Sequence, residues 1–244
     1  MKVLGLVFAS DRERQGGLCW TTPLDGPEGA SLLARAVNTL AATPNVDEVL
    51  VATDAPDLTA LPEGCEGAGL ARLPGWFFDF KLPAFSKEAW LITRALDALE
   101  EAGAGADVLV VHDWRAPLVT PRTLERMYHA LLEDRVAARV AAVYPVDPNL
   151  FMIMPGVDGD GRFFPVWSDP GADRQMIPQL YRNLEIGAFF PRRLRMPIPE
   201  TRGHLLGREE GVLARDAEGL ELARFYLARR ARRAQSAGAT GKGA

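Results

Sequence analysis

The chain has 244 residues, of which 48% are hydrophobic and 25% are charged, as in an ordinary globular protein. Its formal net charge of −4 does not favour binding to nucleic acid or to an acidic membrane surface. No stretch approaches the ~20 apolar residues of a membrane span, and the N-terminal apolar run is too short for a signal peptide. Cys19 and Cys65 predict neither a disulfide scaffold nor a thiolate metal site. We therefore expect a cytoplasmic protein with no nucleic-acid or membrane partner.

Apolar runs alternate with amphipathic segments along the first part of the chain. The runs that predict buried strands are residues 2–10, 46–54, 107–113 and 136–146. The segments that predict helices are residues 31–43, 86–102 and 120–134. Ser31, Ser86 and Thr120 stand where helix N-caps belong, and Pro121 suits a first helical position. A loop-rich stretch, residues 61–83, contains a strand-like run at 77–82.

The second half of the chain has a different pattern. Residues 147–169 predict a hairpin, because an apolar run, a Gly/Asp turn and an aromatic run follow one another. A strand at 183–194 and a helix at 216–233 come next. We expect a single domain over residues 1–228, with residues 149–169 as a protruding hairpin, and a basic, disordered tail over residues 229–244.

The order of strands and helices predicts an α/β fold. Near-continuous apolar strands separated by helices form an open, mostly parallel sheet in three layers, with helices on both faces. Polar residues follow three of the strands, at Ser10 to Arg14, at Thr53 and Asp54, and at His112 to Arg115. In such sheets, ligands bind outside the carboxyl ends of the strands, so we expect these residues to line one crevice. The alternative is that they are solvated loop starts that include a helix cap.

Four segments resemble, in order and spacing, the cytidylyltransferases that activate sugar acids. VDEVLVATDAPDL (46–58) is similar to a family pattern close to IDEVIVSTDDEEI, and residues 107–134 are similar to DIVVLLQPTSPLRTPEDIDEALELL. Residues 173–194 are similar to RRQDLPPVYRENGAIYIFKREAL, and residues 216–227 to DIDTPEDLELAEAL. The resemblance covers about residues 1–227 and is closest to the acylneuraminate cytidylyltransferases, or CMP-sialic acid synthetases.

The resemblance implies a GT-A-like nucleotidyltransferase fold and a homodimer joined through the hairpin. The implied reaction combines CTP with a nonulosonic-type sugar acid to give a CMP-sugar and pyrophosphate, with Mg²⁺ as the cofactor that bridges phosphates. The residues that it places at the nucleotide are Ala9, Ser10, Arg12, Gly16, Gly17 and Arg72, with Arg14 and Asp113 as catalytic residues. The residues that it places at the sugar acid are Arg174, Gln175, Tyr181 and Arg182, and those at the metal are Asp113 and Asp216.

The chemistry of these side chains suits the implied roles. Arginine binds phosphate and carboxylate groups through two parallel hydrogen bonds, and carboxylate oxygens are preferred ligands of Mg²⁺. For Asp216, an N-cap of the last helix is an equally natural role. For His112, we expect a satisfied histidine at the end of a strand rather than a catalytic base. For Arg12 and Arg14, the alternative is that they are solvated side chains of a surface loop.

The first loop departs from the family. Relatives have a loop close to PARGGSKGIPRKNIRPLGGKPL, whereas residues 8–32 place Cys19 and Trp20 at its Lys-Asn pair. This difference favours the alternative of a non-catalytic relative that binds a nucleotide. A second alternative is a methylerythritol-phosphate type of nucleotidyltransferase, because residues 108–127 are similar to its VHDAARPLV segment. The absence of a segment like NIKIT before the last helix argues against that type.

Overall fold

A computed structural model of the chain describes residues 1–10, 18–24, 29–79, 89–146, 156–157, 163–164, 180–195 and 200–240. Its main sheet has seven strands in the order β3-β2-β1-β4-β8-β5-β9. These strands are β1 (Val3–Ala9), β2 (Glu48–Thr53), β3 (Gly69–Arg72), β4 (Val108–His112), β5 (Ala137–Val146), β8 (Leu180–Phe189) and β9 (Glu200–Leu205). The helices are α1 (Leu32–Ala41), α2 (Ala89–Glu101), α3 (Pro121–Glu133), α5 (Pro191–Leu194) and α6 (Ala217–Thr240), with a 3-10 helix η2 at Gly75–Asp79.

The sheet is mostly parallel and open, as the sequence predicts. Strands β3, β2, β1 and β4 pair in parallel, and β9 pairs in parallel with β5. Strand β8 lies between β4 and β5 and is antiparallel to both. A separate two-stranded antiparallel pair, β6 (Gly156–Val157) with β7 (Phe163–Phe164), lies within the segment for which the sequence predicts a hairpin.

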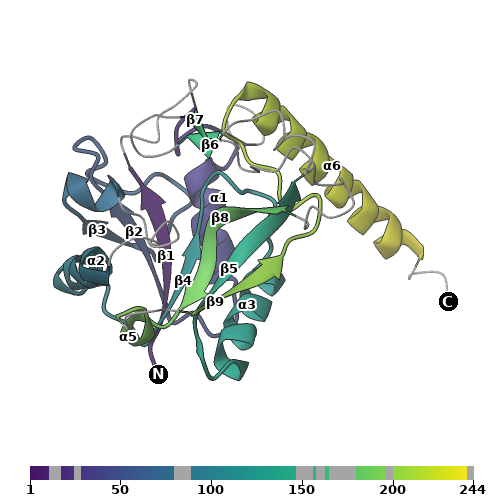
Figure 1. The fold of residues 1–244 in the computed structure, drawn as a ribbon. Coiled ribbons are helices and arrows are strands. Elements are labelled where there is room, and N and C mark those ends of the chain that lie inside the picture. Colours follow the sequence, from purple (N-terminus) through teal and green to yellow (C-terminus); the bar gives the residue numbers. More distant parts are fainter. Residues whose placement is uncertain are drawn as a thin grey trace.

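Helices cover both faces of the sheet, which makes three layers (Figure 1). On one face, Val7 and Val110 belong to a core that includes residues of α1, α3 and α6. On the other face, Phe8 and Val111 belong to a second core that includes residues of η2, α2 and α5. Successive residues of β1 and β4 thus point to opposite faces, as strand geometry requires. The two cores explain why the strands of the sequence are almost uniformly apolar.

Two of the predicted helix caps are confirmed. The side chain of Ser31 accepts a hydrogen bond from the backbone N–H of Ala34, and Thr120 caps α3 through the N–H of Thr123. Such caps satisfy N–H groups that the first turn of a helix leaves without a partner. Ser86 lies outside the described residues.

The region of residues 69–79 differs from the sequence prediction. Residues 69–72 form the edge strand β3, and the strand-like run begins inside the helical turn η2. The side chains of Phe77 and Phe78 are both buried, and their ring centroids lie 5.6 and 6.1 Å from that of Phe8. Consecutive residues of a strand point to opposite faces, whereas a helical turn lets both rings contact the sheet. The prediction of a strand was therefore wrong for residues 77–79.

Helix α6 is longer than the sequence pattern predicts. It runs to Thr240, so residues 229–240 are helical where we expected a disordered tail. Figure 1 shows its C-terminal half extending beyond the body of the molecule. The guanidinium group of Arg224 donates to the carbonyls of Pro23 and Leu24, and that of Arg230 donates to Leu118. These contacts hold α6 against the rest of the domain. The division into a domain at 1–228 and a tail stays a prediction.

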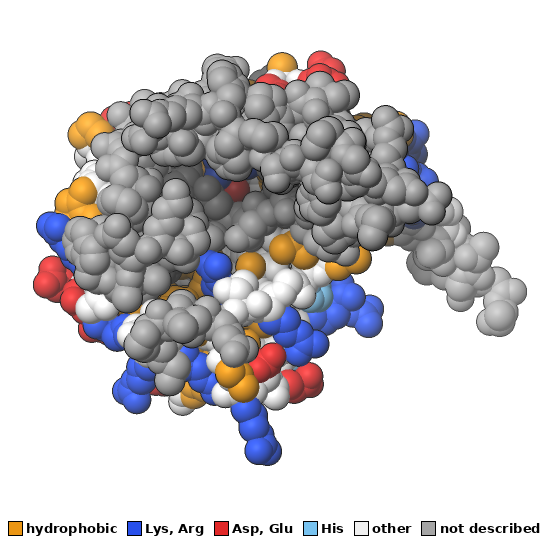
Figure 2. All heavy atoms as spheres, in the orientation of Figure 1, with side chains coloured by type: hydrophobic (Ala, Val, Ile, Leu, Met, Phe, Trp, Pro, Cys, Tyr) orange, Lys and Arg blue, Asp and Glu red, His pale blue; other side chains and the backbone are white. Residues whose placement is uncertain are grey.

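The described surface is mixed in charge. Figure 2 shows Lys and Arg side chains interspersed with Asp and Glu side chains over the described part of one face. Among the described helices, none is both long enough and apolar enough to cross a membrane.

Candidate functional site

The carboxyl ends of four parallel strands meet at one edge of the sheet. In the register of the sheet, Ala9 of β1 lies beside Thr53 of β2, and Thr53 lies beside Arg72 of β3. On the other side of β1, Val7 lies beside His112, the last residue of β4. The polar strand ends that the sequence analysis singled out therefore gather at one edge, which we call the carboxyl edge.

A hydroxyl group joins the ends of β1 and β2. Thr53 Oγ1 donates a hydrogen bond to the Ala9 carbonyl at 2.6 Å and accepts one from the backbone N–H of Ala55 at 3.0 Å. Ala9 and Ser10, which the family resemblance places at the nucleotide, have no exposed surface. A nucleotide contact by Ala9 or Ser10 stays a prediction.

Arg72 has a structural role at the end of β3. Its guanidinium group donates to the carbonyl of Ala55 and, at 2.7 Å, to that of Leu58, so it holds the loop after β2. The same side chain lines a cavity of about 480 Å³ together with Trp76 and Arg94. The guanidinium carbon of Arg94 lies 4.4 Å from the ring centroid of Trp76, a cation–π contact. A phosphate contact for Arg72 stays a prediction.

Asp113, directly after β4, is held in a buried ion pair with Arg115. Asp113 Oδ1 accepts hydrogen bonds from the backbone N–H and from Nε of Arg115, both at 2.9 Å. Asp113 Oδ2 accepts one from Arg115 Nη2, also at 2.9 Å. The Asp113 side chain is 3% exposed and that of Arg115 is 16% exposed. The carboxylate therefore forms a bidentate ion pair with the guanidinium group of Arg115, which the sequence analysis did not predict.

Asp216 lies in a segment that touches the Asp113 turn. The backbone N–H of Ala214 donates to the Arg115 carbonyl at 2.7 Å, which brings the residues before α6 to the carboxyl edge. Asp216 Oδ1 accepts from the N–H of Gly219 at 2.8 Å, in the first turn of α6. Asp216 thus acts as a helix cap, the alternative that the sequence left open, on a segment adjacent to that of Asp113.

The carboxylates at this edge are the kind of ligand that Mg²⁺ prefers, but they are not arranged as a ready metal centre. Mg²⁺ is held by one or two carboxylates and completes its shell with phosphate oxygens and water. Asp113 and Asp216 supply such oxygens on neighbouring segments, although Arg115 and Gly219 now use them. Within the described ranges, no group of three or more His, Cys, Asp or Glu side chains gathers into a metal centre. A metal ion at Asp113 would have to replace Arg115.

The remaining predicted site residues are placed only in part. Arg12, Arg14, Gly16, Gly17, Arg174 and Gln175 lie outside the described residues. For Tyr181 and Arg182, the structure describes the backbone, which pairs with Pro145 and Tyr144 at the start of β8. Because β8 is antiparallel to β4 and β5, its first residues lie toward the carboxyl edge.

His112 is buried and unsatisfied, in contrast to the satisfied histidine that we expected. Its side chain is 1% exposed, and neither ring nitrogen has a hydrogen-bond partner among the described residues. Burial lowers the pKa of His112 from 6.5 to about 4, and the positive charge of Arg35 acts in the same direction against the opposing effect of Asp113. The imidazole is therefore neutral at pH 7, and its lowered pKa makes it a weak general base.

Replacing His112 by leucine should make stability less dependent on pH. Between about pH 4 and 6.5 the unfolded chain binds a proton that the folded chain does not, so folding stability falls as the pH drops through this window. From pH 7.5 to pH 5, the wild-type chain should lose roughly 2 kcal/mol more than His112→Leu. Urea denaturation of both proteins at the two pH values measures the difference. Parallel pH profiles would show that the imidazole is hydrated or paired.

Comparison with known proteins identifies the fold. No family model matches the sequence, and no curated protein matches it. Among solved structures, CMP:2-keto-3-deoxy-manno-octonic acid synthetase in complex with CTP is similar, with a TM-score of 0.62, 14% identity, and coverage of 94% of this chain and 100% of that chain. The fold is that of the cytidylyltransferases.

Two further cytidylyltransferase structures support this assignment. A 4-diphosphocytidyl-2C-methyl-D-erythritol synthase matches 93% of this chain and 98% of its own, with a TM-score of 0.56 and 13% identity. The 2-C-methyl-D-erythritol 4-phosphate cytidylyltransferase from Thermus thermophilus matches 94% of this chain and 100% of its own, with a TM-score of 0.54 and 19% identity. The cytidylyltransferase fold thus accounts for nearly the whole chain.

Proposed function

We propose that this chain is a cytidylyltransferase that activates a nonulosonic-type sugar acid with CTP. An oxygen of the sugar acid attacks the α-phosphorus of CTP, the bond from that phosphorus to the β-phosphate oxygen breaks, and pyrophosphate leaves. The observation that carries the proposal is the carboxyl edge itself, with Asp113 after β4, in a fold shared with three cytidylyltransferases. Ligands of open α/β sheets bind at this edge.

The proposed roles follow the chemistry of each group. Arg12, Arg14, Gly16 and Gly17 contact the triphosphate from the first loop, together with Ala9, Ser10 and Arg72. Asp113 and Asp216 are the proposed ligands of Mg²⁺, which neutralises charge on the leaving pyrophosphate. Arg174, Gln175, Tyr181 and Arg182 contact the carboxylate and hydroxyl groups of the sugar acid. A homodimer through residues 149–169 is part of the same proposal.

A methylerythritol phosphate is the second candidate substrate. Two of the three structures named above are cytidylyltransferases of that type, and the His112–Asp113 pair at the end of β4 resembles the VHDAARPLV segment. The sugar acid is preferred because the resemblance at residues 173–194 is to the sugar-acid enzymes. Pyrophosphate release measured with each substrate in turn, at equal CTP and Mg²⁺, distinguishes the two candidates.

Thermal denaturation with nucleotides tests the proposed function. A ligand that binds only the folded chain adds about 2.7 kcal/mol at a hundred times its Kd, which corresponds to a rise in Tm of roughly 5–10 °C for a chain of this length. We expect CTP with Mg²⁺ to produce such a rise and ATP or GTP to produce little. UTP serves as the matched pyrimidine control. The absence of a shift with any nucleotide at millimolar concentration would contradict the proposal.

A further inference from the structure

The ion pair between Asp113 and Arg115 adds to a turn that backbone hydrogen bonds already close. The turn after β4 is already closed by two backbone donors, from Arg115 to Asp113 Oδ1 and from Ala116 to the Asp113 carbonyl. Asp134 makes a comparable turn, in which its Oδ1 accepts hydrogen bonds from the N–H groups of Val136 and Ala137. Among the interactions described, Asp134 has no bidentate guanidinium partner. Buried ion pairs also add little net stability, because both charges lose their hydration. The guanidinium group of Arg115 therefore calls for a functional explanation.

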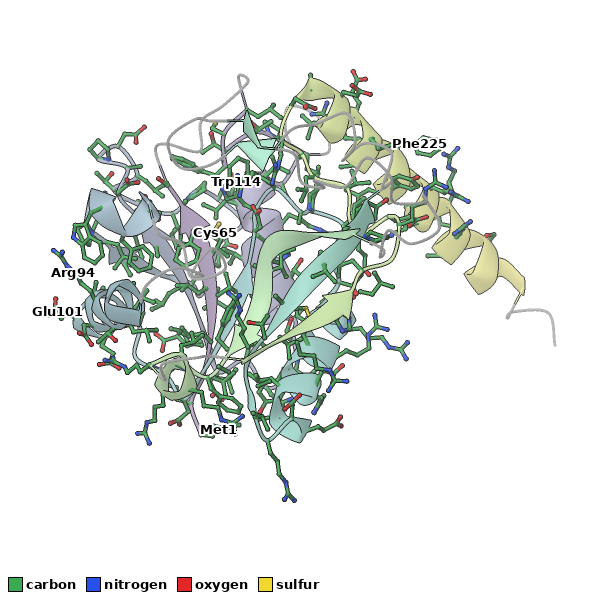
Figure 3. The ribbon with its side chains drawn as sticks, in the orientation of Figure 1. Met1, Cys65, Arg94, Glu101, Trp114 and Phe225 are labelled. Carbon is green, nitrogen blue, oxygen red and sulfur yellow. The ribbon has the colours of Figure 1, made fainter. Side chains whose placement is uncertain are left out.

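The backbone around this pair is anchored by contacts other than the bond between the two side chains. The neighbouring Trp114 is 1% exposed and belongs to the main core, and Figure 3 shows it among the side chains near the carboxyl edge. The Arg115 carbonyl accepts the hydrogen bond from Ala214. The Arg115 side chain, 16% exposed, reaches toward solvent, whereas that of Asp113 is 3% exposed. Arg115 is thus the more exposed partner of the pair.

We propose that Arg115 is an exchangeable counter-ion of Asp113, an inference that rests on the proposed function. In the free chain, Arg115 neutralises the carboxylate and blocks it from a metal ion. When CTP and Mg²⁺ bind together, Asp113 exchanges the guanidinium for the metal, and Arg115 exchanges the carboxylate for a phosphate oxygen. Both charges keep an opposite partner throughout, which avoids the cost of a buried, unpaired charge. A metal ion alone would have to compete with Arg115 for the carboxylate.

The experiment measures metal binding by the full chain without any nucleotide. Mn²⁺ is the probe, followed by the loss of its free-ion signal in electron paramagnetic resonance. The wild-type chain should bind Mn²⁺ weakly, and Arg115→Met, which keeps the apolar length of the side chain, should bind it at least tenfold more tightly. The double variant Arg115→Met/Asp113→Asn should lose that gain. Arg115→Lys keeps the positive charge but cannot form the two parallel hydrogen bonds of a guanidinium group. Its affinity for Mn²⁺ should lie between those of the wild type and Arg115→Met. If Arg115→Met does not fold, Arg115→Lys tests the same inference.

Three outcomes would overturn the inference. One is Mn²⁺ binding by the wild type that depends on Asp113 and does not change in Arg115→Met. Another is the lack of Mn²⁺ binding in every variant, and the third is a gain that persists in the double variant. Because no nucleotide is present, the result does not depend on the proposed function. A failure of CTP to stabilise the chain, with the Mn²⁺ result as expected, would reject the function and the exchange onto a phosphate. It would leave only the part in which Arg115 blocks Asp113 from a metal ion.

Discussion

Replacing Asp113 by asparagine is expected to lower the release of pyrophosphate from CTP and the sugar acid by on the order of a hundredfold or more. The amide keeps the shape of the side chain but removes the negative charge at the carboxyl edge. A hundredfold loss corresponds to a few kcal/mol of charge stabilisation in the transition state. The measurement is the turnover rate at saturating CTP and Mg²⁺ for both proteins, made after the wild-type activity has been established.

The fold should survive this substitution. In Asp113→Asn, the amide oxygen of the new side chain still accepts the hydrogen bond that Asp113 Oδ1 now receives from the Arg115 backbone, and the Arg115 side chain reaches solvent. Asp134→Asn is the matched control, because Asp134 makes a similar turn after α3, at the opposite edge of the sheet. It should leave turnover unchanged. Equal turnover in Asp113→Asn and the wild type would remove Asp113 from the site.

Replacing Gly187 by alanine is expected to destabilise the fold by about 3 kcal/mol, the upper end of the usual cost of overpacking a core. Gly187 lies in β8, between Val111 of β4 and Ala141 of β5. An added Cβ atom would lie 2.6 Å from the Val140 carbonyl oxygen and 3.0 Å from ring atoms of Phe189, which is fully buried. Neither a backbone carbonyl in a central strand nor a packed ring can move away without disturbing both cores. Thermal denaturation should show a fall in Tm of roughly 5–10 °C.

Gly203→Ala is the matched control for this effect. Gly203 also lies in a strand, but β9 is an edge strand, and an added Cβ would lie 3.4 Å from Val143 Cγ2, an ordinary contact. Alanine at this position should leave the Tm unchanged or raise it slightly, because it reduces the freedom of the unfolded chain. Equal losses in the two variants would mean that the close approach at Gly187 is relieved by a small shift of β8.

Local sequence determined the elements whose signals are contained within a few residues. The apolar runs that became β1, β2, β4 and β5 need burial on both faces, which only a covered sheet provides. Ser31 and Thr120 act as caps because their oxygens reach N–H groups only three residues away. The gathering of polar strand ends at one edge followed from the parallel order alone.

The tertiary structure decided what depends on partners distant in the sequence. Phe77 and Phe78 form a helical turn because Phe8, about seventy residues earlier, offers both rings a surface. The continuation of α6 past residue 229 is accompanied by bonds from Arg230 to Leu118 and Glu209, which no local pattern predicts. Asp113 could be predicted as a site residue from its place after a strand, but its bond to Arg115 depends on a turn that the core around Trp114 holds. Propensity and spacing act over a few residues, whereas burial and charge pairing depend on where the whole chain places each group.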